Sequence, residues 1–159
     1  MAVGIHTHAL AYLYQHMAKP VLFLRDPEDV HDAATRVGSA LSASMLGRRI
    51  TRAFFHYEHP LLVSTVAGIE FQNPIGLAAG FDKNANLWNI LPDVGFGFAE
   101  LGSITGKQCS GNARPRLWRM PEQGALQVYY GLMNDGAEVI RARLNGIAPR
   151  CVLGISAAK

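Results

Sequence analysis

The first sixty positions carry apolar residues at the spacing of amphipathic helices. Leu10, Leu13 and Met17 lie on one face of a possible helix. A second helix is predicted from Asp26, which is a good N-cap, and Pro27 suits the first helical position. Its apolar stripe consists largely of small residues: Val30, Ala33, Ala34, Val37 and Leu41. Such a face can pack closely against a neighbour, or leave a slot for a flat ligand.

The periodicity changes after Pro60. Residues 65–71 form two short strand-like pieces around Gly68, which predicts a small hairpin. Apolar runs without alternation follow, as is typical of strands buried on both faces of a parallel sheet. These runs are residues 75–80, 95–102 and 152–155, with helices predicted at 87–91 and 137–144 and a long loop around Gly106, Gly111 and Pro115. Strands that alternate with helices predict right-handed βαβ units, and therefore an α/β fold.

Composition and charge narrow the classes of protein. The chain has 159 residues, of which 49% are hydrophobic and 17% charged, and its formal net charge is +3. This length suits one domain of roughly 100–200 residues. Charges of both signs are mixed along the chain, so no nucleic-acid-binding stripe stands out. The two cysteines have neither CxxC spacing nor histidine partners, which disfavours a disulfide framework and a zinc site and favours a reducing compartment.

The first eighteen residues contain no Asp, Glu, Lys or Arg. Polar residues such as His6, His8 and Gln15 nevertheless interrupt their apolar character. A spanning helix needs about 20 predominantly apolar residues, and a signal peptide needs a basic start and a small-residue cleavage site. Neither pattern fits. If this segment meets a membrane, it would rest on the surface and not cross it.

Small residues and one cation follow the first buried run. Residues 78–80 are Ala-Ala-Gly, which would let backbone groups approach a planar ligand, and Lys83 adds a positive charge. A strand-end turn with a solvated lysine is the plainer interpretation of the same residues. Gly102 and Ser103 after the second run could hold a ring edge or a phosphate, or simply end a strand. The glycines match neither GxGxxG nor a Walker loop, which disfavours a Rossmann domain.

Three longer segments carry a family resemblance. They are residues 73–84, 95–105 and 111–122, and their order and separations match as well. In these segments the chain resembles the quinone-dependent (class 2, membrane-associated) dihydroorotate dehydrogenases, of which it would be the amino-terminal portion only. The resemblance runs from about residue 20 to residue 159. The amino-terminal helices indicate the membrane-associated class, because the soluble classes lack that extension.

The resemblance implies a fold and a reaction. Residues 1–60 would form a helical membrane and quinone-tunnel extension. Residues 61–159 would form the first three βα units of a flavin-binding (β/α)8 TIM barrel, which stays incomplete. In this family FMN accepts a hydride from dihydroorotate, which becomes orotate, and a membrane quinone is the final electron acceptor, in de novo pyrimidine (UMP) biosynthesis. The implied location is peripheral on a membrane, facing the cytoplasm in a bacterium or on the mitochondrial inner membrane in a eukaryote.

The resemblance also implies roles for individual residues. FMN would be bound by Ala78, Ala79, Gly80, Lys83, Gly102, Ser103 and Ser156. Dihydroorotate or orotate would contact Lys83, Val128, Tyr130, Gly131 and Leu132. The quinone would contact His31, Ala34 and Arg119, although His31 without the resemblance would be an ordinary surface histidine. No metal ligand and no nucleic-acid contact is implied, and the family's catalytic base, a serine, lies beyond Lys159.

The chain departs from the family pattern at several of these positions. The family reads Asn-Arg-x-Gly-Phe-Asn where residues 128–133 are Val-Tyr-Tyr-Gly-Leu-Met, so Val128 replaces an amide that would contact flavin and orotate. Ser156 likewise stands where the family has asparagine. The alternative to an enzyme is therefore a truncated, non-catalytic remnant that at most binds membrane, a partner or a separate carboxyl-terminal half. Another flavin barrel is disfavoured by the Phe-Asp-Lys context of residues 81–83.

Overall fold

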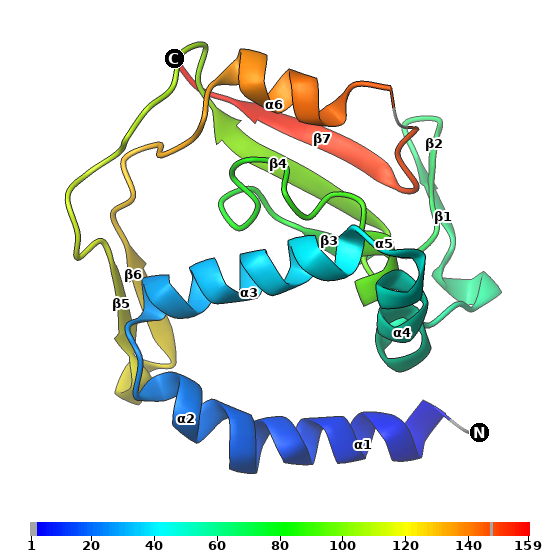
Figure 1. Cartoon of the computed structure of the whole chain (residues 1–159). Coiled ribbons are helices and arrows are strands. Elements are labelled where there is room, and N and C mark those ends of the chain that lie inside the picture. Colours follow the sequence, from blue (N-terminus) through cyan, green and yellow to red (C-terminus); the bar gives the residue numbers. More distant parts are fainter. Residues whose placement is uncertain (1–2, 147) are drawn as a thin grey trace. The chain divides into compact units, whose positions relative to one another are not determined.

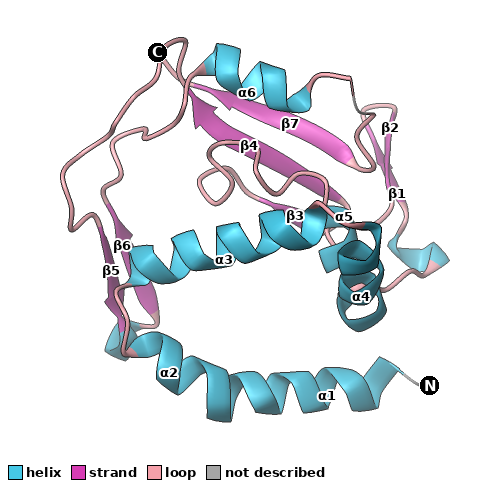
Figure 2. Cartoon of the chain, viewed as in Figure 1, coloured by secondary structure: helices cyan, strands magenta, loops and turns pink. Residues whose placement is uncertain are grey.

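The computed structural model describes residues 3–146 and 148–159, and contains both helices and strands (Figure 1). The described strands form one three-stranded sheet and two two-stranded sheets (Figure 2). The chain divides into two compact units. The first consists of residues 1–34 and 114–129, and the second of residues 35–113 and 130–159. The predicted α/β class is confirmed.

Helices make up the amino-terminal part of the first unit. They are α1 (Val3–Leu13), a π-helical turn (Tyr14–Ala18), α2 (Lys19–Phe23) and the start of α3 (Pro27–Ser42). Asp26 caps α3 as predicted, because its Oδ1 accepts hydrogen bonds from the backbone N–H groups of Glu28 at 2.8 Å and Asp29 at 3.2 Å. Helices at both predicted positions are therefore confirmed.

An antiparallel hairpin lies in the first unit where the sequence predicted only a loop. Its strands are β5 (Leu117–Met120) and β6 (Ala125–Val128). The segment that leads into β5 is tied to α3 by ion pairs. The Glu28 carboxylate is 2% exposed and lies 2.8 Å from Arg116 Nη2 and 3.1 Å from Arg114 Nε. Arg114 also pairs with Asp29 and Asp32, so charges more than eighty positions apart hold this unit together.

A parallel sheet forms the centre of the second unit. Its strands are β3 (Gly76–Leu77), β4 (Phe98–Ile104) and β7 (Val152–Ala157), in the order β3–β4–β7. Helix α6 (Ala137–Leu144), which was predicted, lies along β4 and β7 (Figure 1). Its Ile140 packs against Leu101 of β4 in a buried cluster that also contains Ala85, Trp88 and Ile104. A second buried cluster contains Leu87, Ile90, Leu91 and Ala99.

The sheet differs from the prediction of strands buried on both faces. Ala99 and Leu101 of β4 are fully buried, whereas Glu100 between them is exposed. Successive side chains of a strand point to opposite faces, so the described chain covers only one face of the sheet along this part of β4. The opposite face is available to a ligand or to further chain.

The short helix of this unit begins where the sequence predicted one to end. α5 runs from Leu91 to Val94, with Pro92 in its first turn, where the missing N–H has no helical partner to lose. The prediction of a helix at residues 87–91 is therefore wrong in position.

The predicted hairpin of β1 (Ser64–Val66) and β2 (Ile69–Phe71) is confirmed, with φ values of 52° at Ala67 and 79° at Gly68. Helix α4 (Met45–Phe55), capped by the Ser44 hydroxyl, was not predicted.

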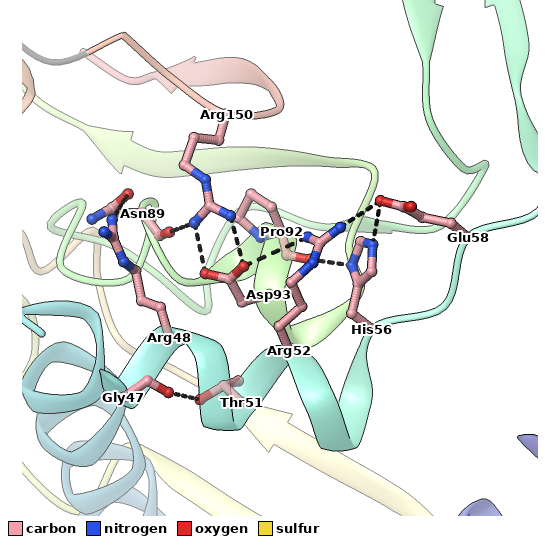
Figure 3. Close-up of polar contacts among 10 residues, drawn as sticks. All are labelled: Gly47, Arg48, Thr51, Arg52, His56, Glu58, Asn89, Pro92, Asp93 and Arg150. Atoms are coloured by element: carbon pink, nitrogen blue, oxygen red, sulfur yellow. Dashed lines mark hydrogen bonds and ion pairs between the residues drawn. The ribbon is translucent and has the colours of Figure 1, made fainter. Parts of the chain in front are cut away.

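A charged network joins α4, α5 and the segment that leads into β7 (Figure 3). Arg150 donates two hydrogen bonds to the Asp93 carboxylate, at 2.6 and 2.7 Å. Arg52 lies 3.7 Å from Asp93 and also pairs with Glu58. Burial raises the pKa of Asp93, but the hydrogen bond and charge of Arg150, with the charges of Arg52 and Arg48, outweigh burial and lower the pKa overall. Asp93 is 2% exposed in its side chain and is the shared partner in this network.

We expect Asp93→Asn to destabilise the chain by about 1.5–3 kcal/mol at pH 7, the usual range for hydrogen bonds to a charged group. A lowered folded-state pKa contributes stability that is present above the unfolded pKa and lost as pH falls through the folded pKa. The difference between wild type and variant should therefore shrink below about pH 4. Urea unfolding at several pH values measures this difference, with Glu122→Gln, an exposed carboxylate outside this network, as the control. A difference that stays constant with pH would contradict the role of Asp93.

Candidate functional site

The parallel strands β3, β4 and β7 end at one edge of their sheet. The register pairs Gly76 with Phe98 and Gly102 with Ser156, so the segments after these strands emerge close together. We call the edge formed by residues 78–83, 102–103 and 156 the carboxyl edge. All seven residues that the sequence predicted to bind flavin lie on this edge. Active sites of parallel α/β folds lie at such edges, because the loops that follow the strands converge there.

Backbone hydrogen bonds join the loop after β3 to the end of β4. The Gly80 N–H donates to the Gly102 carbonyl at 2.7 Å, and the Gly102 N–H donates to the Asp82 carbonyl at 3.1 Å. Both glycines have positive φ, at 104° and 119°. A Cβ at Gly102 would lie 2.6 Å from the Ser156 carbonyl oxygen, whereas a Cβ at Gly80 would meet nothing within 4 Å. The carboxyl edge is thus tightly packed below Gly102 and open at Gly80.

Two hydroxyl groups meet at the ends of β4 and β7. The Oγ atoms of Ser103 and Ser156 lie 2.8 Å apart and share a hydrogen bond. Both residues are half-buried, and the neighbouring Ala78 and Gly80 are exposed while Ala79 is half-buried. The edge therefore combines small side chains, backbone and a hydroxyl pair, which suits hydrogen bonding along the rim of a flat, polar ligand.

Lys83 and Tyr130 are brought together although 47 positions separate them. The Lys83 Nζ lies 3.9 Å from the centroid of the Tyr130 ring, within the range of a cation–π contact. Tyr130 is 9% exposed, and its carbonyl accepts a hydrogen bond from the Asn112 N–H at 2.9 Å. Gly131 and Leu132 follow with φ values of 68° and 59°. The structure therefore places three of the predicted substrate residues, Tyr130, Gly131 and Leu132, in the segment that begins under Lys83.

The remaining candidate residues belong to the first unit. Val128 is 59% exposed in β6, where it pairs with Leu117. His31 is half-buried and Ala34 is exposed, both on α3. Arg119 of β5 lies over the Phe23 ring at 4.7 Å and donates from Nη1 to the Arg25 carbonyl at 2.6 Å. Within this unit Arg119 is thus anchored to the chain that connects α2 with α3.

Sequence reasoning missed two buried polar residues, Asp82 on the carboxyl edge and Asn134 in the segment after Leu132. Asp82 is 1% exposed, and Asn134, at 2% exposed, binds both the Thr105 hydroxyl and the Leu132 carbonyl through its Nδ2. Asp82 could have been recognised as a carboxylate directly after an apolar run, because a buried charge needs hydrogen-bonding or charged partners. Asn134 had no comparable signal. Among the described residues, no group of three or more His, Cys, Asp or Glu side chains is arranged to hold a metal ion.

Comparison with known proteins decides the family. Residues 61–159, which include the whole carboxyl edge, match the family described as "Dihydroorotate dehydrogenase". The chain belongs to the dihydroorotate dehydrogenase family.

Curated members of this family resemble most of the chain. The chain is 40% identical over 148 residues to the dihydroorotate dehydrogenase (quinone) of Methylococcus capsulatus, covering 92% of this chain and 42% of the relative. It is 43% identical over 131 residues to the enzyme of that name from Nitratiruptor, covering 82% and 37%. The chain thus spans about 40% of the length of these relatives.

A solved structure supports the same assignment. The dihydroorotate dehydrogenase of Eimeria tenella in complex with ferulenol superimposes with a TM-score of 0.67 at 31% identity. The match covers 84% of this chain and 36% of that one. Most of this chain therefore shares the fold of about a third of that structure.

Substitution of Gly80 and of Gly102 should lower the stability of the chain by different amounts. Gly80→Ala should destabilise the chain by about 1–3 kcal/mol, the cost of an unfavourable positive φ. Gly102→Ala should cost more, because its Cβ would also strike the Ser156 carbonyl. Urea unfolding of both variants tests this difference. Equal losses would show that the end of β4 is not packed tightly against β7.

Proposed function

We propose that this chain forms the amino-terminal part of an enzyme that oxidises dihydroorotate to orotate, with FMN as hydride acceptor and a membrane quinone as final electron acceptor. The enzyme would act in de novo pyrimidine biosynthesis. The observation that carries the proposal is the carboxyl edge, which combines an open backbone surface at Gly80 with the Ser103–Ser156 hydroxyl pair. The loop that contains Gly80 also contributes Lys83, whose ammonium lies over the Tyr130 ring. Residues 61–159 would be the opening of a (β/α)8 flavin barrel and residues 1–60 its quinone-binding extension.

The residues of the carboxyl edge fit a flavin. Residues 78–80 and Gly102 present backbone without bulky side chains, and a Cβ at Gly80 would meet empty space, as close approach of a flat ring requires. Ser103 and Ser156 offer hydroxyl groups that can donate or accept. Bound FMN would supply the hydride-accepting chemistry. The protein's part is to orient the ring and to hold a positive charge beside it.

Lys83 supplies that charge and also suits the orotate carboxylate. An ammonium is a compact cation with three donors, so it can face an anionic substrate while it remains over the Tyr130 ring. Tyr130, Gly131 and Leu132 would form the adjoining substrate wall. Val128, at the position of the family's asparagine, offers no hydrogen bond, which predicts weaker orotate binding than in relatives that carry the amide.

The first unit suits an apolar substrate and a lipid surface. Along α1, the π-turn and α2, large apolar side chains are exposed: Tyr12, Leu13, Tyr14, Met17, Val21, Leu22, Phe23 and Leu24. No helix among the described residues is long and apolar enough to cross a bilayer. The exposed apolar side chains of these helices lead us to propose peripheral membrane association, with His31, Ala34 and Arg119 along the path of the quinone. The location would be the cytoplasmic face of a bacterial membrane, or the inner mitochondrial membrane in a eukaryote.

A chimera tests the activity. Residues 1–159 would be joined to the part of the Methylococcus capsulatus relative that lies beyond the matched region, which restores the length of that enzyme. The chimera should bind FMN and reduce a quinone with dihydroorotate. Lys83→Ala should weaken orotate binding about tenfold or more, because a hydrogen bond to a charged group is worth about 1.5–3 kcal/mol. The exposed Lys107→Ala serves as the control and should change neither property.

The chimera also distinguishes the non-catalytic alternative. A folded chimera that binds FMN but leaves dihydroorotate unoxidised would favour a decayed remnant. Full activity of Lys83→Ala would mean that the cation has been assigned to the wrong residue.

Membrane association can be tested on the chain itself. Val21→Asn with Leu24→Asn should reduce co-sedimentation with lipid vesicles, because both side chains are exposed, at 61% and 86%. Leu61→Asn replaces an equally exposed side chain, at 87%, outside the amino-terminal helices and should have no effect. Equal loss in all variants would point to general apolar adhesion instead of a membrane-facing surface.

A further inference from the structure

Asp82 is a fully buried carboxylate that neither the proposed flavin contacts nor the proposed substrate contacts use. Its side chain lies at the start of the loop after β3, where residue exposure is 1%. Oδ1 accepts a hydrogen bond from the Asn86 N–H and Oδ2 one from the Leu87 N–H, both at 2.8 Å. Its own carbonyl accepts from the Gly102 N–H. One residue therefore ties the loop to itself and to the end of β4.

We propose that Asp82 is a positioning residue that holds Lys83 over the Tyr130 ring, and thereby places the cation of the carboxyl edge. This inference rests on the proposed function, in which Lys83 meets flavin and orotate. Asp82 itself touches neither ligand. Its role is to fix the backbone from which the lysine side chain extends.

The residue on the other side of Lys83 is fixed as well. Asn84 Oδ1 accepts a hydrogen bond from the Asp135 N–H at 2.9 Å, and the Asn84 carbonyl accepts one from Arg143 Nη1 at 2.9 Å. Lys83 thus lies between two anchored neighbours. A long lysine side chain has many rotamers, so its ammonium keeps one place only if its Cα is fixed and its stem is packed.

The chemistry of the site requires a carboxylate. Each of the two oxygens receives its own backbone N–H, which an amide of the same shape cannot reproduce, because its NH2 group would face a second donor. Burial raises the pKa of Asp82, and the backbone N–H groups of Leu87, Asn86, Asn84 and Trp88 oppose that shift. These N–H groups favour the anion, and so counteract the cost of burying it.

The Lys83 side chain provides a direct readout of its position in the full 159-residue chain. An aromatic ring shifts the proton resonances of groups above its face upfield, and Lys83 Nζ lies 3.9 Å from the Tyr130 centroid. The chain has only four lysines, Lys19, Lys83, Lys107 and Lys159, so labelled lysine gives few signals to assign. Tyr130→Leu removes the ring and should abolish the Lys83 shift, which identifies the signal. Lys19, 5.3 Å from the Phe23 centroid, serves as an internal reference.

Asp82→Asn should move the Lys83 CεH2 signal most of the way to the position of exposed lysines and leave Lys19 unchanged. Asp93→Asn is the matched control, because it removes a different buried carboxylate of the same unit. It should lower the thermal midpoint without moving the Lys83 signal. An unchanged Lys83 signal in folded Asp82→Asn overturns the proposal, as does an equal displacement in folded Asp93→Asn.

Asp82→Glu covers the case in which the amide variant fails to fold. Glutamate keeps two acceptor oxygens but has a longer stem, so the loop should close with Lys83 displaced and its shift reduced. A folded Asp82→Glu chain with the wild-type Lys83 shift would reduce Asp82 to a purely structural residue and overturn the proposal. Because these spectra need no flavin or substrate, their outcome does not depend on the activity of the chimera. Displaced Lys83 signals together with an inactive chimera would contradict the proposed function alone.

Discussion

The arrangement of the carboxyl edge depends on the pair of backbone hydrogen bonds between the loop after β3 and Gly102. Through them the loop that carries Lys83 is held to the strand that carries Ser103, and Ser103 in turn meets Ser156 of β7. A side chain at Gly102 would collide with the Ser156 carbonyl, so this approach requires glycine. Small residues at the ends of the parallel strands therefore allow the three strands to approach closely and to present one continuous polar surface.

Local physical rules predicted the parts of the fold that depend on neighbouring residues. The Asp26 cap, the hairpin turn at Ala67 and Gly68, and helix α6 follow from capping, turn conformation and periodicity. These rules did not predict the position of α5. A proline can follow the end of a helix or occupy its first turn, and the packing of Leu91 in the core favours the second arrangement for Pro92. The β5–β6 hairpin was missed because long-range ion pairs tie it to α3, and no short-range pattern reveals them.

The candidate site divides in the same way. Lys83, Gly80, Gly102 and Ser103 were recognisable in the sequence, since strand ends and family motifs mark them. The contact of Lys83 with Tyr130 and the anchoring of its neighbours by Asp82 and Asn84 are tertiary features that required coordinates. The exposed face of β4 at Glu100 fits a chain that spans about 40% of the length of its relatives, in which further chain is available to cover it.

The central claim is that the carboxyl edge of this chain binds flavin and orotate through Lys83. A crystal structure of the length-restored chimera with FMN and orotate tests it most directly. The account predicts a flavin ring along residues 78–80 and Gly102, with the Lys83 ammonium in hydrogen-bonding contact with the orotate carboxylate. Ligands bound elsewhere, or Lys83 turned to solvent with both ligands present, would contradict it.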